Sequence, residues 1–171
     1  MYKVRSVALP EESRITHLYL SPDLADAFAI TLPPDAPSDT ESLARILLAT
    51  PPRWFRWLLA CRDAIVKPFG IQTSGQLRKR LAVGGSAHID FFPVLSVDAN
   101  ELIIGENDSH LDFRTSVLVR SRGGLDEREV VLTSVVRCHN RIGKLYTWLI
   151  APFHRRVVSS MLSRAEAKGW R

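Results

Sequence analysis

An alternating run of apolar and polar residues between His110 and Arg120 constrains the fold of this chain more than any other feature. Successive side chains of a strand point to opposite faces, so every second residue shares a face. One face of this strand is apolar and is expected to pack on a core, which is the usual arrangement in an antiparallel sheet. The apolar set consists of Leu111, Phe113, Thr115, Val117 and Val119.

The segments on either side of this run predict further antiparallel strands. The tripeptide Asp98-Ala99-Asn100 has a composition typical of turns, and Gly123-Gly124 turns the chain again. Pro33-Pro34 ends the strand pattern near the N-terminus. The predicted strands cover residues 89–97, 101–106, 110–120 and 130–139, with one or two short strands within residues 14–32.

Two short helices are predicted before these strands. Ser38 and Glu41 resemble a capping box at the start of a helix over residues 39–49. A second helix begins after Thr50, the predicted N-cap, and ends at Pro68 and Gly70. Its core-facing stripe is predicted to consist of Trp54, Leu58, Cys61, Ile65 and Phe69. Residues 71–87 predict a long loop or a short edge strand, with a mobile lid as the alternative.

A long helix is predicted over residues 142–168, where apolar residues recur every four positions. Pro152 lacks the N–H that would bond to the Trp148 carbonyl, so a kink or a break is expected there. The order of elements predicts an α+β fold, in which helices cover one face of a curved antiparallel sheet. Such a helix laid across a curved sheet often leaves a cavity between the two.

The 171 residues predict a single domain, 1–171, with 46% hydrophobic and 24% charged residues. We expect a cytoplasmic protein, because no apolar stretch has the length of a signal peptide or a membrane span. Cys61 and Cys138 lie in apolar surroundings without metal-ligand spacing, which favours two reduced thiols.

The net charge of +5 is unevenly distributed. Residues 51–80 and 137–171 are basic, while residues 81–113 contain six acidic residues and no Lys or Arg. Charges arranged in this way can meet within the fold. A nucleic-acid-binding protein more often has one basic stripe with interleaved aromatic residues, so we expect no nucleic-acid partner.

The segments Gly105–Arg114, Val135–Asn140, Gly143–Tyr146 and Pro152–Arg155 resemble the bacterial domain of unknown function 2867, from about residue 20 to the end. The resemblance implies a START-like, helix-grip fold: a curved antiparallel sheet with two short N-terminal helices and a long C-terminal helix. Members of that superfamily bind lipids, sterols and other apolar ligands, and some are cyclases or dehydratases. Some relatives follow a short-chain-dehydrogenase-like domain. No Gly-rich fingerprint follows a predicted strand here, so we expect these 171 residues not to include that domain.

His110, Asp112 and Arg114 are the first candidate ligand-binding residues, because alternate residues of a strand share a face. A histidine, a carboxylate and a guanidinium in a row could position an anionic or carbonyl group. The alternative is a cross-strand polar ladder on the solvent face. The sequence does not decide which face of this strand is buried.

Arg62 and His154 complete the candidate set. Arg62 falls within the apolar arc of its helix, where it could hold an acidic ligand group, lie along the surface or form a structural ion pair. His154 follows Pro152 and could point into a pocket. The spacing of the histidines does not support a metal site, so we expect neither a metal nor another cofactor.

Three functions remain open. The first is the binding of a small apolar or amphipathic molecule in a cavity between the sheet and the C-terminal helix. The second is a cyclase, dehydratase or hydrolase on the same scaffold, with His110, Asp112 or His154 as titratable groups. The third is an interaction module, as a homodimer or beside a dehydrogenase-like partner, with an exposed apolar patch around Trp148 or Trp170.

Overall fold

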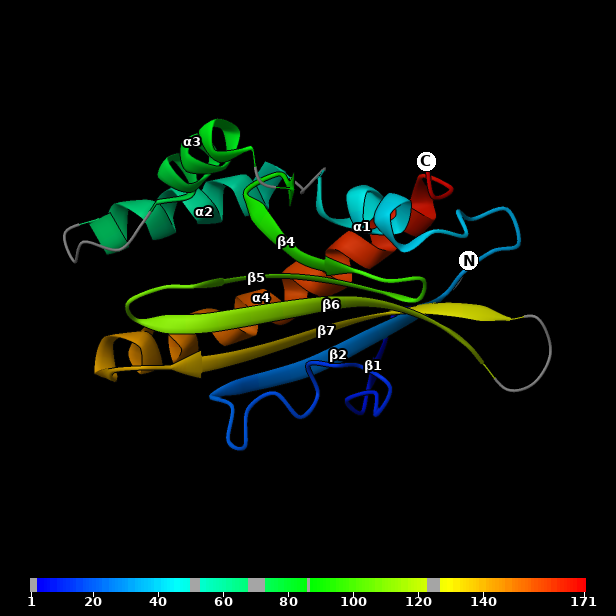
Figure 1. Ribbon diagram of the computed structural model, residues 1–171, viewed down its shortest axis with the longest axis horizontal. Coiled ribbons are helices and arrows are strands. Elements are labelled where there is room, and N and C mark those ends of the chain that lie inside the picture. The colour runs from blue at the N-terminus through cyan, green and yellow to red at the C-terminus, as the bar shows by residue number, and fades with distance from the viewer. Residues whose placement is uncertain (1–2, 50–52, 68–72, 86, 123–126) are drawn as a thin grey trace.

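The fold is α+β, with a seven-stranded antiparallel sheet that curves around a long C-terminal helix (Figure 1). The computed structural model describes residues 3–49, 53–67, 73–85, 87–122 and 127–171. The strand order is β1-β2-β7-β6-β5-β4-β3. The strands are β1 (Arg5–Val7), β2 (Leu24–Thr31), β3 (His88–Ile89), β4 (Phe92–Val97), β5 (Glu101–Asn107), β6 (Leu111–Ser121) and β7 (Arg128–Cys138). The helices are α1 (Thr40–Leu48), α2 (Arg53–Val66), α3 (Ser74–Gly84) and α4 (Arg141–Ala167).

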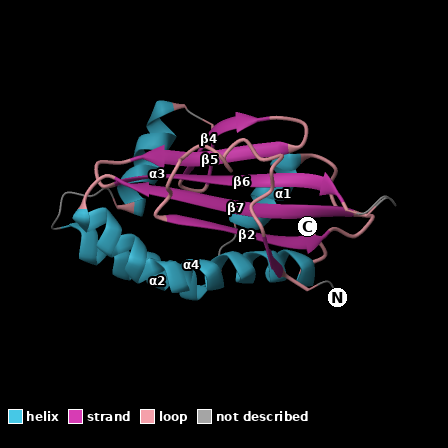
Figure 2. Cartoon of the chain, turned by 90° about the horizontal axis from the view of Figure 1, so that it is seen from below, coloured by secondary structure: helices cyan, strands magenta, loops and turns pink. Residues whose placement is uncertain are grey.

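The inner face of the sheet packs against α1 and α4, as the alternation in β6 predicts. Val117 and Val119 lie on this face with their register partners in β7, Leu132 and Val130. Figure 2 shows α4 running along the sheet. Helices α1 and α4 close this core with Leu43, Ala44, Leu47, Leu48, Val157, Val158, Met161, Leu162 and Ala165.

The outer face of the sheet is covered by the chain between β1 and β2, which crosses it in Figure 2. Ile15 and Tyr19 of this segment pack against Ile103 and Val135. Both faces of the central strands are therefore buried. This explains why residues 101–105 of β5 and 129–135 of β7 are buried without alternation.

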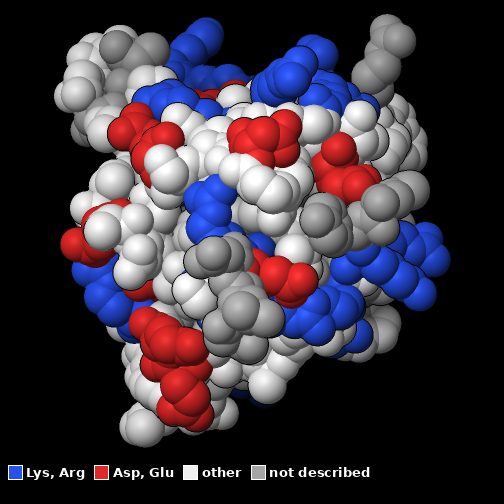
Figure 3. All heavy atoms as spheres, turned by 90° about the vertical axis from the view of Figure 1, so that its right-hand side faces the viewer, with Lys and Arg blue, Asp and Glu red and all other residues white. Residues whose placement is uncertain are grey.

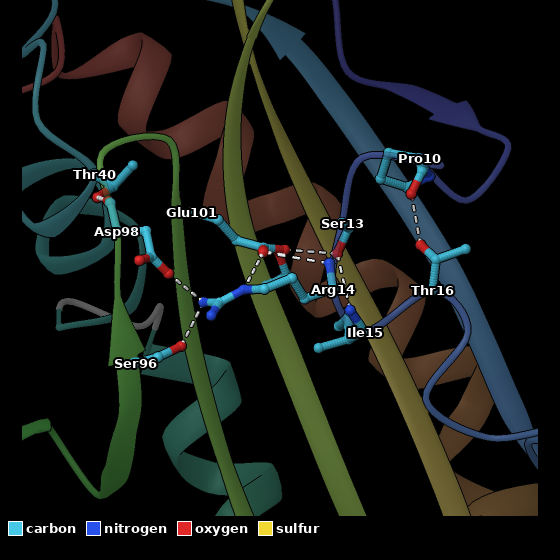
Figure 4. A network of polar contacts seen from close by, with 10 residues as sticks. Pro10, Ser13, Arg14, Ile15, Thr16, Thr40, Ser96, Asp98 and Glu101 are labelled. Carbon is cyan, nitrogen blue, oxygen red and sulfur yellow. Dashed lines mark hydrogen bonds and ion pairs between the residues drawn. The ribbon is translucent and has the colours of Figure 1, made fainter.

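A buried carboxylate holds this N-terminal segment in place. Glu101 accepts hydrogen bonds from the hydroxyls of Ser13 and Ser116, both at 2.6 Å, and from Nε of Arg14 at 3.1 Å (Figure 4). Burial alone would raise the pKa of Glu101, but the hydrogen bonds from Ser116, Ser13 and Arg14 outweigh it and hold the pKa below its usual value. The ionised carboxylate is therefore the form that the fold stabilises.

The N-terminal third differs in detail from the sequence prediction. Strand β1 was not expected, and residues 14–20 form turns rather than a strand. Asp39, not Ser38, caps α1, because its side chain accepts the Ser42 N–H at 2.7 Å. The predicted N-cap of the second helix, Thr50, lies outside the described residues.

Helix α3 replaces the predicted loop or edge strand, so three helices rather than two precede the strands from β3 onward. Thr73 and Gln76 form the capping box that starts α3, and Gly85 ends it in the left-handed conformation. Its sequence, SGQLRKRLAVG, is mostly polar and has no apolar stripe, so periodicity gave no helical signal. The capping box was the one local signal available.

Helix α4 runs without interruption through Pro152, so no break occurs there. Its start is set by Asn140, whose side chain accepts the Gly143 N–H at 2.9 Å. Gly143 lies so close to β6 that a Cβ atom would overlap the backbone carbonyl oxygen of His110. Only glycine permits the first turn of α4 to pack at this position.

We expect Glu101→Gln to lower the free energy of unfolding by about 2–4 kcal/mol near neutral pH, since it removes a buried charge around which the donors are arranged. Because the pKa of Glu101 is lower in the folded chain, its contribution is complete above the unfolded pKa of about 4.3 and is lost as the pH falls through the folded value. The difference between variant and wild type should therefore shrink in acid. Urea unfolding at several pH values measures it.

Glu41→Gln is the matched control, because Glu41 forms an exposed pair with Arg45 one turn away. It should change the free energy of unfolding by no more than about 0.5 kcal/mol. A Glu101→Gln deficit that stayed constant into acid would contradict the charge-based account.

We expect Gly143→Ala to destabilise the fold by about 1–3 kcal/mol, because the new methyl group meets backbone atoms that cannot rotate away. Gly75→Ala in α3 is the control: a Cβ there has no neighbour within 4 Å and should raise stability by about 0.5–1 kcal/mol. Thermal unfolding compares the two. Equal effects would mean that the contact between α4 and His110 is not tight.

Candidate functional site

A groove of about 660 Å³ lies between α2 and α4 and is open to solvent. Its walls are mainly apolar, and its polar groups come from α4. The lining residues are Trp54, Trp57 and Leu58 of α2 with Phe153, Arg155, Arg156, Ser159, Ser160 and Ser163 of α4.

Helical spacing brings these side chains into line. Trp54, Trp57 and Leu58 stand three and four residues apart, so they share one face of α2. Arg156 and Ser160 extend from Phe153 along the facing side of α4 at the same spacings. The groove therefore has two aromatic rings on one wall, a third ring on the other, and a row of hydroxyls beyond it.

The charge of the groove is positive. Arg155 Nε lies 3.9 Å from Oδ2 of Asp26, so this carboxylate offsets part of its charge. Arg156 is exposed and forms no ion pair with the residues that the structure describes. Two guanidinium groups beside aromatic rings can bind a planar anionic group through paired hydrogen bonds.

Polar contacts hold α2 and α3 to each other and to the sheet. Asp63 of α2 accepts the backbone N–H of Ser74 at 3.1 Å and its hydroxyl at 2.6 Å. Arg78 of α3 donates to Asp90 at 2.8 Å, and Arg80 donates to Glu106 of β5 at 2.7 Å. The α2 wall of the groove thus rests on a helical pair that is fixed to the sheet by ion pairs.

His154 lies behind the groove and faces the sheet. Its Nε2 is 3.4 Å from Oδ1 of Asp26, whose side chain is only 9% exposed. Asp26 is the register partner of Ser134 in β7, and Ser134 Oγ lies 3.2 Å from Thr115 Oγ1. The structure therefore places a polar strip under α4 that includes one of the predicted ligand-binding residues.

Asp112 and Arg114 lie on the opposite, outer face of the sheet. Asp112 Oδ2 is 2.9 Å from Nε2 of His139. Arg114 donates to the carbonyl of Phe113 at 2.7 Å and to Oδ1 of Asn107 at 2.6 Å. These contacts are those of a polar ladder between neighbouring strands, the alternative that the sequence left open. A ligand-binding role for the two residues stays a prediction.

Tyr19 of the N-terminal segment shares the surroundings of this ladder. Burial is the main reason why the pKa of the Tyr19 hydroxyl is raised, with Asp112 adding to the rise and Arg114 and Arg137 opposing it. The ladder therefore lies beneath the N-terminal segment rather than on the side of α4 that carries the groove.

His110 precedes β6 and does not share the face of Asp112 and Arg114. Its side chain is buried, and its ring meets the ring of Tyr146 edge to face with centroids 5.6 Å apart. Nδ1 of His110 is 3.4 Å from Oδ2 of Asp108. His110 thus lies at the start of α4, and the structure does not bring it together with Asp112 and Arg114.

Arg62 belongs to α2, but its side chain lies outside what the structure describes. Within the described residues no group of three His, Cys, Asp or Glu side chains could hold a metal ion. Basic and acidic side chains are interspersed on the face that Figure 3 shows, so no basic stripe occurs there.

The groove residues were missed because their pattern resembles that of a core. Trp54 was assigned to the buried stripe of α2, yet it is 40% exposed. No pattern in the sequence singles out Arg155 or Arg156 as a binding residue. A signal was present in the sequence: α4 contains five basic residues and a single acidic one, Glu166.

Comparison with known proteins gives a family and no named relative. The comparisons with curated proteins and with solved structures gave no significant match. A family model described as "Protein of unknown function (DUF2867)" matches residues 18–161, which is most of the chain. The chain therefore belongs to the DUF2867 family.

Proposed function

We propose that this chain binds a small amphipathic anion in the groove between α2 and α4, on a scaffold of the helix-grip kind. The observation that carries the proposal is the lining of the groove, which pairs three aromatic rings with two guanidinium groups. The apolar body of the ligand lies against Trp54, Trp57 and Phe153. Its carboxylate, sulfonate or phosphate group accepts hydrogen bonds from Arg155 and Arg156.

Size and composition support this proposal. Binding sites for small molecules typically enclose about 300–1,000 Å³ and combine apolar walls with a few polar groups, and the groove fits both criteria. The space between the sheet and the second half of α4 is filled by the side chains of Val157, Val158, Met161 and Leu162. We therefore place the ligand on the α2 side of α4 rather than beneath the helix.

Binding is favoured over catalysis by the side chains available. No Asp, Glu, His or Cys is among the described residues that line the groove, so proton transfer at neutral pH has no ordinary donor or acceptor there. The cyclase, dehydratase or hydrolase alternative needs two titratable groups facing one cavity. His154 and Asp26 pair with each other behind the groove instead.

We expect the aromatic sulfonate 8-anilinonaphthalene-1-sulfonate to bind saturably at one site on the native protein. Arg156→Gln should raise the dissociation constant roughly tenfold, because it removes a charge without a carboxylate partner among the described residues. Trp54→Ala should raise the dissociation constant by a similar factor through loss of apolar contact. Fluorescence titration measures both.

Arg164→Gln is the matched control, because Arg164 is an exposed basic residue of the same helix that does not line the groove. It should leave the dissociation constant unchanged. If Arg156→Gln and Arg164→Gln had equal effects, the probe would be responding to net charge and the groove would not be its site.

A ligand retained from the expression host provides a second test. Native mass spectrometry of the recombinant chain should show extra mass that is lost on denaturation. The extra mass should be reduced in a Trp54→Ala, Arg156→Gln double variant. Retention of the same mass by this variant would place the ligand elsewhere in the molecule.

A further inference from the structure

The outward face of α4 carries large apolar side chains that no described part of the chain covers. Leu145 is 65% exposed and Trp148 is 74% exposed. We name this surface the outer stripe; it consists of Ile142, Leu145, Trp148, Leu149 and Phe153. The sequence predicted an exposed patch around Trp148 or Trp170, and only the first is exposed, since Trp170 is 2% accessible.

The outer stripe is aligned by the helix rather than scattered over the surface. Trp148 and Leu149 lie three and four residues after Leu145, so the three side chains share a face of α4. The opposite face of the same helix is buried through Gly143, Thr147 and Val157. At its far end the stripe reaches the groove, where Phe153 faces Trp57 of α2, which is itself 67% exposed. Contiguous exposed apolar surface of this kind marks an interaction site.

Positive charge flanks the outer stripe at both ends. Arg141 and Lys144 lie at its start, Arg155 and Arg156 lie at its end, and all four are exposed. Arg141–Arg156 contains no acidic residue. Asp23 lies 3.9 Å from Lys144 and Asp26 lies 3.9 Å from Arg155, so the flanking charge is only partly offset by neighbouring elements.

We propose that the outer stripe docks this protein on the surface of an anionic lipid membrane. Leu and Ile side chains would enter the acyl region, Trp148 would lie at the level of the headgroups, and the flanking Arg and Lys would contact lipid phosphates. In this arrangement the protein lies on the membrane surface. None of the helices within the described ranges has an apolar stretch long enough to cross a membrane.

A second copy of this chain suits the surface less well. In a two-fold dimer the same patch meets itself, so Arg141, Lys144, Arg155 and Arg156 would approach the like charges of the partner. A single ridge of one helix is also narrow for a stable protein interface. An anionic lipid surface removes the repulsion and accepts a ridge of this shape. This proposal does not depend on ligand binding in the groove.

Sedimentation of the full chain with vesicles tests the proposal. We expect binding to phosphatidylcholine vesicles that contain about one third phosphatidylglycerol, and little binding to phosphatidylcholine alone. Raising NaCl from ~0.1 M to ~0.5 M should weaken the binding. Leu145→Ala with Trp148→Ala should reduce the partition coefficient at least roughly tenfold, and Arg141→Gln with Lys144→Gln should do so on anionic vesicles alone.

Leu20→Ala is the matched control, because Leu20 is a fully exposed leucine in the N-terminal segment that covers the outer face of the sheet. It should bind vesicles as the wild type does. The substituted residues of α4 are exposed, so thermal unfolding should show every variant folded.

Three outcomes would overturn the proposal: no binding to anionic vesicles, equal binding by the Leu145 and Trp148 double variant, or a dimer in light scattering that this variant dissociates. The last outcome would assign the outer stripe to a second copy. Quenching of Trp fluorescence by brominated lipid gives an independent readout, since Trp148→Phe should lose most of the quenching while the variant still binds.

Discussion

The contact between Gly143 and the His110 carbonyl determines how the rest of the helical layer is arranged. It brings the first turn of α4 against the chain that leads into β6, and the edge-to-face contact of His110 with Tyr146 supports the same junction. Once this end is fixed, the helix has one buried face and one exposed face for its whole length. His154, the outer stripe and the groove residues of α4 all owe their directions to that placement.

The second constraint is that the sheet has two apolar faces and only one layer of helices. The N-terminal segment covers the other face, and the buried charge of Glu101 fixes it there through Ser13 and Arg14. This cover explains why Asp112 and Arg114 on the outer face are partly buried. They are polar residues of a face that the chain itself closes: Arg114 donates to Asn107 of β5, and Asp112 pairs with His139 just after β7.

Local periodicity made most of the architecture predictable. The alternation in β6 predicted a strand with one apolar face but left open which face is buried, and the four-residue repeat predicted α4 within one residue at each end. It failed for α3, which is a mostly polar helix recognised by its cap, and for β1, a strand of three residues. The groove could not be predicted, because Trp54 and Phe153 line it from two helices about a hundred residues apart in the chain, and periodicity within one helix says nothing of the other. Periodicity identifies an apolar face but not whether anything covers it.

That distinction matters most for α4, because its apolar residues fall into two groups. Those of its second half, such as Met161 and Leu162, fill the core, while Leu145 and Trp148 of the first half point away from it. A four-residue series alone would assign Leu145 and Met161 to the same buried stripe, although they differ completely in exposure. A water-exposed Trp beside exposed leucines is not accounted for by the stability of the fold, since burying them would have been favourable.

Phe153 belongs both to the outer stripe and to the groove. If the stripe rests on a membrane, this end of the groove lies at the boundary between water and lipid. The two proposals then describe one surface, although each can fail without the other.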